Sequence, residues 1–257
     1  MALRFCANLS FMFPESKSLL ERYALAKKCG FSAVECAFPY DFSVHEVQNA
    51  KEKAGVEQIL INVYPGKTEF GFAALPGKQS EFRDSLQKAV TYAKALDCRL
   101  IHIMAGIVES PTSEHEHTYR TNLIHASQVL QQEQMVGVIE PISSFALPNY
   151  FMNSFDKAVS YIRDINSPHL RLQVDLYHLQ MMKGNLSYNL NEYLPITEHI
   201  QVAQVPDRHE PDSEGEINFC YIFKLLKELN YSGWIGCEYH PASSTQSGLD
   251  WMNTLNS

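Results

Sequence analysis

Several features that define specialised protein classes are missing from this sequence. The 257 residues contain no apolar run that approaches the ~20 residues needed to span a membrane as a helix. The first segment, MALRFCANLSFMF, is interrupted by Arg4 and Asn8 and lacks the charged start and clean apolar stretch of a signal peptide. We therefore expect a cytoplasmic protein that does not associate with membranes.

Basic charge is also scarce. Lys and Arg total 21 against 29 Asp and Glu, so the formal charge is −8, which argues against a protein that binds nucleic acid by neutralising its phosphates. Hydrophobic residues make up 45% of the chain and charged residues 19%, the composition of a folded globular protein. The expected partner is a small molecule and not nucleic acid, and assembly into a homo-oligomer stays open.

Cysteine pairs are absent as well. None of the six cysteines forms a CxxC motif, and most of them fall in apolar segments. We expect buried free thiols in a reducing compartment and not a disulfide framework.

What the sequence does contain is a regular alternation of short β-rich runs with longer amphipathic segments. Eight strands are predicted, at 3–9, 33–38, 57–63, 100–105, 137–142, 170–178, 199–205 and 233–239. Helical patterns are predicted at 18–30, 43–55, 79–97, 118–134, 154–165, 188–195, 219–230 and 245–255.

Eight strands, each followed by a helix, have the order of a (β/α)₈ TIM barrel, here a single domain over residues 1–257. The alternative is an open, doubly wound sheet. No predicted strand leads into a GxGxxG turn, which favours the barrel.

The period of two along each strand predicts which residues face the barrel interior. It places one polar residue inward near the C-terminal end of every strand: Asn8, Glu35, Asn62, His102, Glu140, Asp175, Gln201 and Glu238. Barrel interiors are usually filled by branched apolar side chains, and active sites lie at the C-terminal ends of the strands. The polar ring is therefore the predicted site.

Four members of this ring are acidic, and close carboxylates repel each other unless a cation lies among them or they hold protons. A hydrogen-bonded structural role would explain any one of them alone. Convergence of all four favours a divalent cation, and the oxygen atoms of Glu140, Asp175, Gln201 and Glu238 suit Mg²⁺ or Mn²⁺.

The segments IEP, QVDLYH, HIQVAQVPDRHEP, GEINF and GWIGCEYHP resemble the hydroxypyruvate isomerases of the xylose-isomerase-like TIM barrel superfamily. The resemblance runs from LRFCANLSFMFP through INVYPG and IHIMAG to GLDW, which is nearly the whole chain. It implies an aldose-ketose type isomerase that interconverts hydroxypyruvate and 2-hydroxy-3-oxopropanoate (tartronate semialdehyde). It also implies a divalent cation as cofactor.

The resemblance assigns roles to individual residues. It implies metal ligands at Glu140, Asp175, Gln201 (where relatives use His) and Glu238, with both glutamates acting as the acid/base pair. His178 and Arg208 look like the groups that bind substrate oxygens in related epimerases. Asn62 and His102, from the inward ring, complete the predicted substrate-binding set.

The residue types suit this chemistry without the resemblance. Isomerising an α-hydroxy aldehyde to an α-hydroxy ketone moves a proton between neighbouring carbons through an enediolate, which two carboxylates and a divalent ion can support. A substrate carboxylate needs a cation, and Arg208 offers a planar, bidentate one.

The chain departs from the family at Ser143 and Phe145, where many relatives carry Asn and Arg, and at Ala242, where they carry Arg. Four alternatives stay open: a 2-oxo-tetronate isomerase, a ketose epimerase, a phosphodiesterase of the abasic-endonuclease type, and a catalytically silent metabolite-binding barrel. The presence of both glutamates favours an enzyme. Gln201 in a His position and the acidic charge disfavour the phosphodiesterase.

Overall fold

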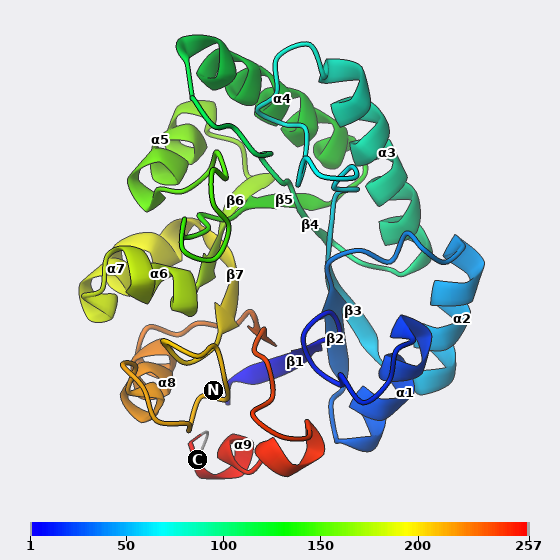
Figure 1. Cartoon of the computed structure of the whole chain (residues 1–257), viewed down its shortest axis with the longest axis vertical. Coiled ribbons are helices and arrows are strands. Elements are labelled where there is room, and N and C mark those ends of the chain that lie inside the picture. Colours follow the sequence, from blue (N-terminus) through cyan, green and yellow to red (C-terminus); the bar gives the residue numbers. More distant parts are fainter. Residues whose placement is uncertain (1, 256–257) are drawn as a thin grey trace.

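Eight parallel strands close into a barrel in the order β1 to β8, as predicted. The computed structural model describes residues 2–255, and each strand pairs with its neighbours in sequence while β8 returns to β1. Figure 1 shows the helices on the outside of these strands. The strands are β1 (Arg4–Asn8), β2 (Ala33–Cys36), β3 (Glu57–Asn62), β4 (Leu100–His102), β5 (Val136–Ile139), β6 (Leu170–Asp175), β7 (Thr197–Val202) and β8 (Trp234–Cys237).

The helices lie between the strands at the predicted places, with one addition. They are α1 (Leu19–Lys28), α2 (Val44–Ala54), α3 (Gln79–Ala95), α4 (Ser113–Gln132), α5 (Phe155–Ile165), α6 (Leu176–Met182), α7 (Leu186–Tyr193), α8 (Phe219–Glu228) and α9 (Trp251–Thr254). Short 3₁₀ turns cover Leu194–Ile196 and Gln246–Gly248. Within residues 2–255, no helix combines the length and the apolar character required to cross a membrane.

The added helix, α6, corrects the prediction that a strand extends to residue 178. β6 ends at Asp175, whose side chain accepts a hydrogen bond of 2.8 Å from the backbone N–H of Tyr177 and so caps the next helix. Leu176 fits the apolar pattern of either a strand or a helix. The strand ends here because the Asp175 carboxylate caps the helix that follows. Met181 and Met182 form the last turn of this helix.

Several predicted boundaries were too generous in the same way. β4 ends at His102 and β5 at Ile139, because the chain leaves the sheet as soon as it reaches the polar ring. The segment predicted as one helix at 245–255 is a 3₁₀ turn followed by α9, where Trp251 packs edge-on against Phe5 of β1 at 5.0 Å between ring centroids.

The strands divide their side chains between two environments, as their period of two predicts. Leu172, Val174, Ile200 and Val202 face outward and belong to the main core beneath the helices. A smaller apolar cluster includes Ala33, Leu60, Leu100, Val136 and Val138 and fills the lower interior of the barrel.

The polar ring stands directly on this lower cluster. Ala33, Leu60, Leu100 and Val138 each precede a ring residue by two positions and therefore point the same way: toward Glu35, Asn62, His102 and Glu140. The barrel interior is thus apolar at its N-terminal end and polar at its C-terminal end.

The six cysteines are free, as predicted. Cys6, Cys36, Cys98 and Cys237 are buried and Cys29 is half-buried, but Cys220 is exposed on α8.

Candidate active site

A cavity of about 200 Å³ opens at the C-terminal ends of the strands. Its polar lining comes from six residues at the C-terminal ends of six successive strands, β3 to β8: Asn62, His102, Glu140, His178, Arg208 and Glu238, together with Gln173 beneath them. Every residue predicted to bind substrate, and both predicted acid/base glutamates, therefore line one small space.

Arg208 is the cation of this cavity. Its Nη2 donates hydrogen bonds to Asp175 Oδ2 at 2.9 Å and to Glu238 Oε1 at 2.7 Å. The guanidinium lies between the rings of Phe11 and Tyr177, at 4.7 and 4.8 Å from their centroids. Stacking of this kind holds a guanidinium in one plane while its edges stay free to bond.

The backbone of Arg208 is also held in a defined conformation. Its φ of 58° lies in the left-handed region, which non-glycine residues adopt at a cost and which is enriched at functional sites. The backbone N–H of Arg208 bonds to Gln204 O at 2.9 Å, and its carbonyl accepts from His240 N–H at 2.8 Å. The first bond closes a turn within the loop after β7, and the second holds that loop against the chain after β8.

Of the two carboxylates that line the cavity, Glu238 accepts more hydrogen bonds than Glu140. Oε2 accepts from Asn8 Nδ2 at 2.7 Å and from Gln201 Nε2 at 2.6 Å, while Oε1 accepts from Arg208. Burial, and beyond it the charges of Asp175 and Glu35, raise the pKa of Glu238 to about 8, and Arg208 opposes that rise.

Glu140 has much less support. Oε2 accepts from Gln173 Nε2 at 2.9 Å, and Oε1 has no hydrogen-bond partner among residues 2–255. Burial first, and then the charges of Glu238 and Asp175, raise the pKa of Glu140 well above its ordinary value. One arginine does not neutralise three carboxylates, and Glu140, which Arg208 does not contact, keeps its proton to a higher pH than an ordinary glutamate does.

Two histidines face Glu140 as neutral imidazoles. Burial lowers the pKa of His178 to about 4 and that of His102 to about 3. His178 Nδ1 accepts from the Ser143 backbone N–H at 3.3 Å, so the proton of the neutral ring sits on Nε2, 3.5 Å from Asp175 Oδ2 and 3.8 Å from Glu140 Oε1. His102 Nδ1 lies 3.5 Å from Glu140 Oε2.

Gln201 lies differently from the other three predicted metal ligands. Its Nε2 turns toward Glu238, and its Oε1 accepts from Gln173 Nε2 at 2.7 Å. Its ligand role stays a prediction. His178, predicted to bind substrate, instead shares with Glu140 and Asp175 a set of ligand-type atoms that all lie within 4.8 Å of one another.

Three further residues of the site were not singled out from the sequence. Gln173 was visible as an inward residue two positions before Asp175, but it carried no charge to attract attention. Phe11 and Tyr177, which enclose Arg208, lie beyond the ends of β1 and β6, where the strand period no longer predicts direction.

Comparison with known proteins identifies the family of this barrel. Residues 23–255 match the model of the xylose isomerase-like TIM barrel family. The chain belongs to that family. The resemblance seen in its sequence is therefore confirmed.

Relatives within this family are isomerases by name. A Danio rerio protein that bears a hydroxypyruvate isomerase name is 47% identical, over 97% of this chain and 94% of its own. A Cupriavidus necator protein named 2-oxo-tetronate isomerase is 38% identical, over 97% of each chain. A crystal structure from Brucella melitensis, described as an AP endonuclease of family 2, superposes with a TM-score of 0.95 at 40% identity over 100% of both chains.

The residues at the top of the barrel fit a divalent cation. Glu140 Oε1 is a buried, unpaired carboxylate oxygen, and it lies in the same cluster as a carboxylate oxygen of Asp175 and a ring nitrogen of His178. Carboxylate oxygens are the donors that Mn²⁺ and Mg²⁺ prefer, and the neighbouring imidazole is a ligand that softer divalent ions also accept.

The pKa of Glu140 leads to a prediction for metal-free protein held with a chelator. Unfolded Glu140 ionises near ~4.3, whereas the folded residue keeps its proton to higher pH, so wild-type stability should fall as the pH rises above about 5. The loss approaches about 1.4 kcal/mol for each pH unit. Glu140→Gln cannot ionise, so its unfolding free energy in urea should fall less over this range.

Glu228→Gln on the exposed face of α8 is the matched control, and its curve should run parallel to that of the wild type. If the curve of Glu140→Gln also runs parallel, Glu140 is ionised in the fold and our assignment of the proton is wrong.

Proposed function

We propose that the protein is an isomerase that interconverts hydroxypyruvate and 2-hydroxy-3-oxopropanoate by proton transfer between Glu140 and Glu238. The observation that carries the proposal is the unlike environment of these two carboxyl groups on one cavity. Glu238 accepts from Arg208 and two amides, so it gives up its proton more readily than Glu140, which is left nearly unsupported. A base and an acid on the same cavity are what this isomerisation requires.

In the forward direction, Glu238 takes a proton from C3 of hydroxypyruvate and the electron pair moves onto the carbonyl oxygen at C2. The product of this step is an enediolate. Glu140 then gives its proton to C2 while the hydroxyl proton passes from the oxygen on C3 to the oxygen on C2. No atom is gained or lost, and the roles of the two glutamates exchange in the reverse direction.

The neutral imidazoles of His102 and His178 suit the oxygen-to-oxygen step, because a neutral ring can donate from one nitrogen and accept at the other. A divalent cation held by Glu140, Asp175 and Glu238, with Gln201 or His178, would stabilise the negative charge of the enediolate as a Lewis acid.

Arg208 is suited to the substrate carboxylate. Nη2 and Nε contact Asp175 and Glu238, but Nη1 makes no hydrogen bond to the residues that the structure describes. Arg208 also lines the cavity, so a donor with positive charge remains available there. The volume of about 200 Å³ is below the roughly 300–1,000 Å³ of pockets for drug-sized ligands and suits a three- or four-carbon acid.

A four-carbon 2-oxo-tetronate is the second candidate substrate. It is favoured by the Cupriavidus necator relative, which is 38% identical over 97% of each chain and is named for that substrate. The same glutamates and Arg208 would serve, since the reacting carbons carry the same groups.

The endonuclease description of the Brucella melitensis structure is less suited to this site. A multi-zinc phosphodiesterase needs several histidine ligands and a basic face for DNA. Within residues 2–255, the histidines that line the cavity are His102 and His178, and the chain carries a formal charge of −8.

Incubation with three- and four-carbon hydroxy-oxo acids in D₂O tests the proposal. The wild type should incorporate deuterium at the carbon next to the carbonyl of hydroxypyruvate. Glu238→Gln, which cannot take a proton, should lower kcat by ~10²- to 10⁴-fold, whereas Glu228→Gln should turn over like the wild type. Exchange with tetronates alone would select the second candidate, and no exchange with any acid would make this a silent barrel.

Substitution of Arg208 separates recognition of the acid from chemistry. Arg208→Lys keeps a charge beside Asp175 and Glu238 but loses the planar second donor, so KM for hydroxypyruvate should rise by roughly 10- to 100-fold, the ~1.5–3 kcal/mol of a charged hydrogen bond. Dihydroxyacetone, which has no carboxylate, should be affected little. Arg171→Lys, at the opposite end of β6, is the control. Equal losses for both substrates would show that Arg208 acts through Asp175 and Glu238 and not on the substrate carboxylate.

Metal binding can be tested without turnover. Asp175→Asn keeps the oxygen that caps α6 but removes one negative charge, so the affinity for Mn²⁺ in titration calorimetry should fall by at least about tenfold, or about 1.4 kcal/mol. Asp156→Asn, an exposed carboxylate paired with Lys183, should bind as the wild type does. Unchanged affinity in Asp175→Asn would remove Asp175 from the ligand set.

A further inference from the structure

Beneath the cavity, four hydrogen bonds form a closed ring between two carboxylates and two amides. Asn8 Nδ2 donates to Glu35 Oε1 at 2.8 Å and to Glu238 Oε2 at 2.7 Å. Gln201 Nε2 donates to the same two oxygens, at 2.7 and 2.6 Å. Each amide thus uses both of its hydrogens, and each carboxylate oxygen accepts twice.

The chemistry of the groups fixes the direction of these bonds. An ionised carboxylate only accepts hydrogen bonds, so an amide that lies between two carboxylates must present its NH₂ group to both. Gln173 supports the same orientation of Gln201, because its own Nε2 donates to Gln201 Oε1 at 2.7 Å and to Glu140 Oε2 at 2.9 Å. The ring therefore also connects the two glutamates of the proposed reaction.

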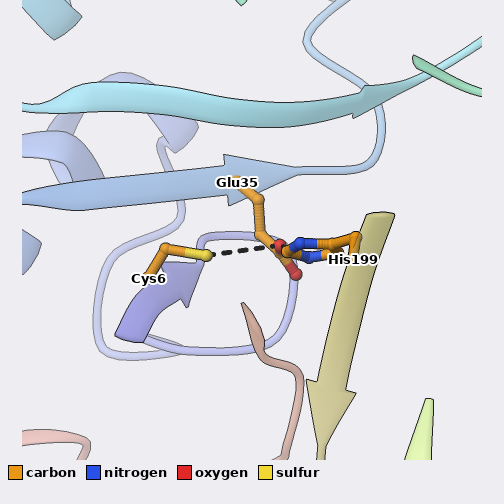
Figure 2. Close-up of side chains that lie close together, drawn as sticks. All are labelled: Cys6, Glu35 and His199. Atoms are coloured by element: carbon orange, nitrogen blue, oxygen red, sulfur yellow. Dashed lines mark hydrogen bonds and ion pairs between the residues drawn. The ribbon is translucent and has the colours of Figure 1, made fainter. Parts of the chain in front are cut away.

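Glu35 supplies the lower corner of the ring and is completely satisfied. Figure 2 shows Cys6 and His199 reaching its carboxylate from β1 and β7. His199 Nε2 donates to Oε2 at 2.6 Å and Cys6 Sγ lies 3.4 Å from the same oxygen. Burial alone would raise the pKa of Glu35, but His199 and the two amides lower it below its ordinary value.

Gly236 of β8 makes the space for this corner. A Cβ atom at Gly236 would lie 2.3 Å from Glu35 Oε1, the oxygen that closes the ring. A strand residue with any side chain would displace the carboxylate, so the backbone of β8 is adapted to the position of Glu35.

Cys6, Glu35 and His199 also form a set of metal-ligand types, but their distances are those of a hydrogen-bonded group. His199 Nε2 and Glu35 Oε2 are 2.6 Å apart. Two ligands of a tetrahedral zinc with bonds of roughly 2.0–2.1 Å lie roughly 3.3 Å apart.

We propose that Glu35, held in place by His199, is a positioning residue for Glu238. The ring fills both acceptor sites of Glu238 Oε2 and so leaves Oε1 as the oxygen that faces Arg208 and the substrate. This inference rests on the proposed role of Glu238 as the base. Without Glu35, each amide loses one of its two acceptors, and its NH₂ group is held toward Glu238 only by the bond that its oxygen accepts, from Gln173 Nε2 for Gln201 and from the Ser10 N–H for Asn8. The Glu238 carboxylate is then less firmly held in the reacting position.

The test joins turnover to a signal of the ring itself. Glu35→Met keeps the length of the side chain but offers no carboxylate, and kcat for hydroxypyruvate should fall by about 10- to 100-fold with KM nearly unchanged, as for other residues that orient a reacting group. Glu35→Gln keeps one accepting oxygen and should have an intermediate kcat. Cys6→Ser, which contacts the same carboxylate outside the ring, should retain wild-type kcat.

The side-chain amide hydrogens of Asn8 and Gln201 give a readout that needs no activity. In ¹⁵N-labelled wild type both NH₂ groups, assigned by their loss in Asn8→Ser and Gln201→Ser, should exchange slowly with D₂O. They should remain protected in Cys6→Ser and lose protection in Glu35→Gln or Glu35→Met. Rapid exchange in the wild type would show that the ring does not form.

The two proposals fail in different ways. An active wild type together with an equally active Glu35→Met would overturn the positioning role and leave the isomerase intact. A wild type that exchanges no deuterium with any acid, although both amides are protected, would overturn the isomerase and with it the role of the ring in catalysis.

Discussion

Burying a carboxylate is unfavourable unless hydrogen bonds and positive charge replace the water that it loses, and this barrel gathers four in one half of its interior. Glu35, Glu140 and Asp175 are fully buried and the Glu238 side chain is 15% exposed. Glu35 is satisfied by His199, Cys6 and two amides, while Asp175 and Glu238 share the guanidinium of Arg208. Glu140 alone is left short of donors, and its burial raises its pKa well above the ordinary value.

The layered interior of the barrel makes this arrangement possible. Residues two positions apart on a strand point the same way, so the apolar cluster below supports the polar groups above, and Gly236 clears the single place where a β carbon would strike Glu35. The N-terminal halves of the strands thus supply the apolar core, and their C-terminal ends supply the polar groups of the candidate site. The lower half resembles an ordinary protein core, and the upper half concentrates polar groups that would be unfavourable anywhere else in the interior.

The sequence predicted the barrel from the alternation of eight strands with helices, and it predicted the polar ring from the period of two within each strand. It placed Glu140, Asp175 and Glu238 around one volume, and it named Arg208 through resemblance to known relatives. It did not predict that Asp175 begins α6, because a capping carboxylate and an inward-facing one look the same in sequence. It also did not predict the bonds among Glu35, Asn8 and Gln201, since strand period gives direction but not which amide meets which carboxylate.

The fold shows where the residues that depart from the family pattern lie relative to the cavity. Phe145, where relatives carry Arg, is 81% exposed on the loop after β5, and the backbone N–H of Ala242 is bonded to Glu210 away from the cavity. Among residues 2–255, Arg208 is thus the one Lys or Arg that lines the cavity. It has to neutralise Asp175 and Glu238 through Nη2 while Nη1 remains open to a ligand. A site with one shared guanidinium suits a small substrate with a single carboxylate, since a second anionic group would find no further Lys or Arg side chain in the cavity lining that the structure describes.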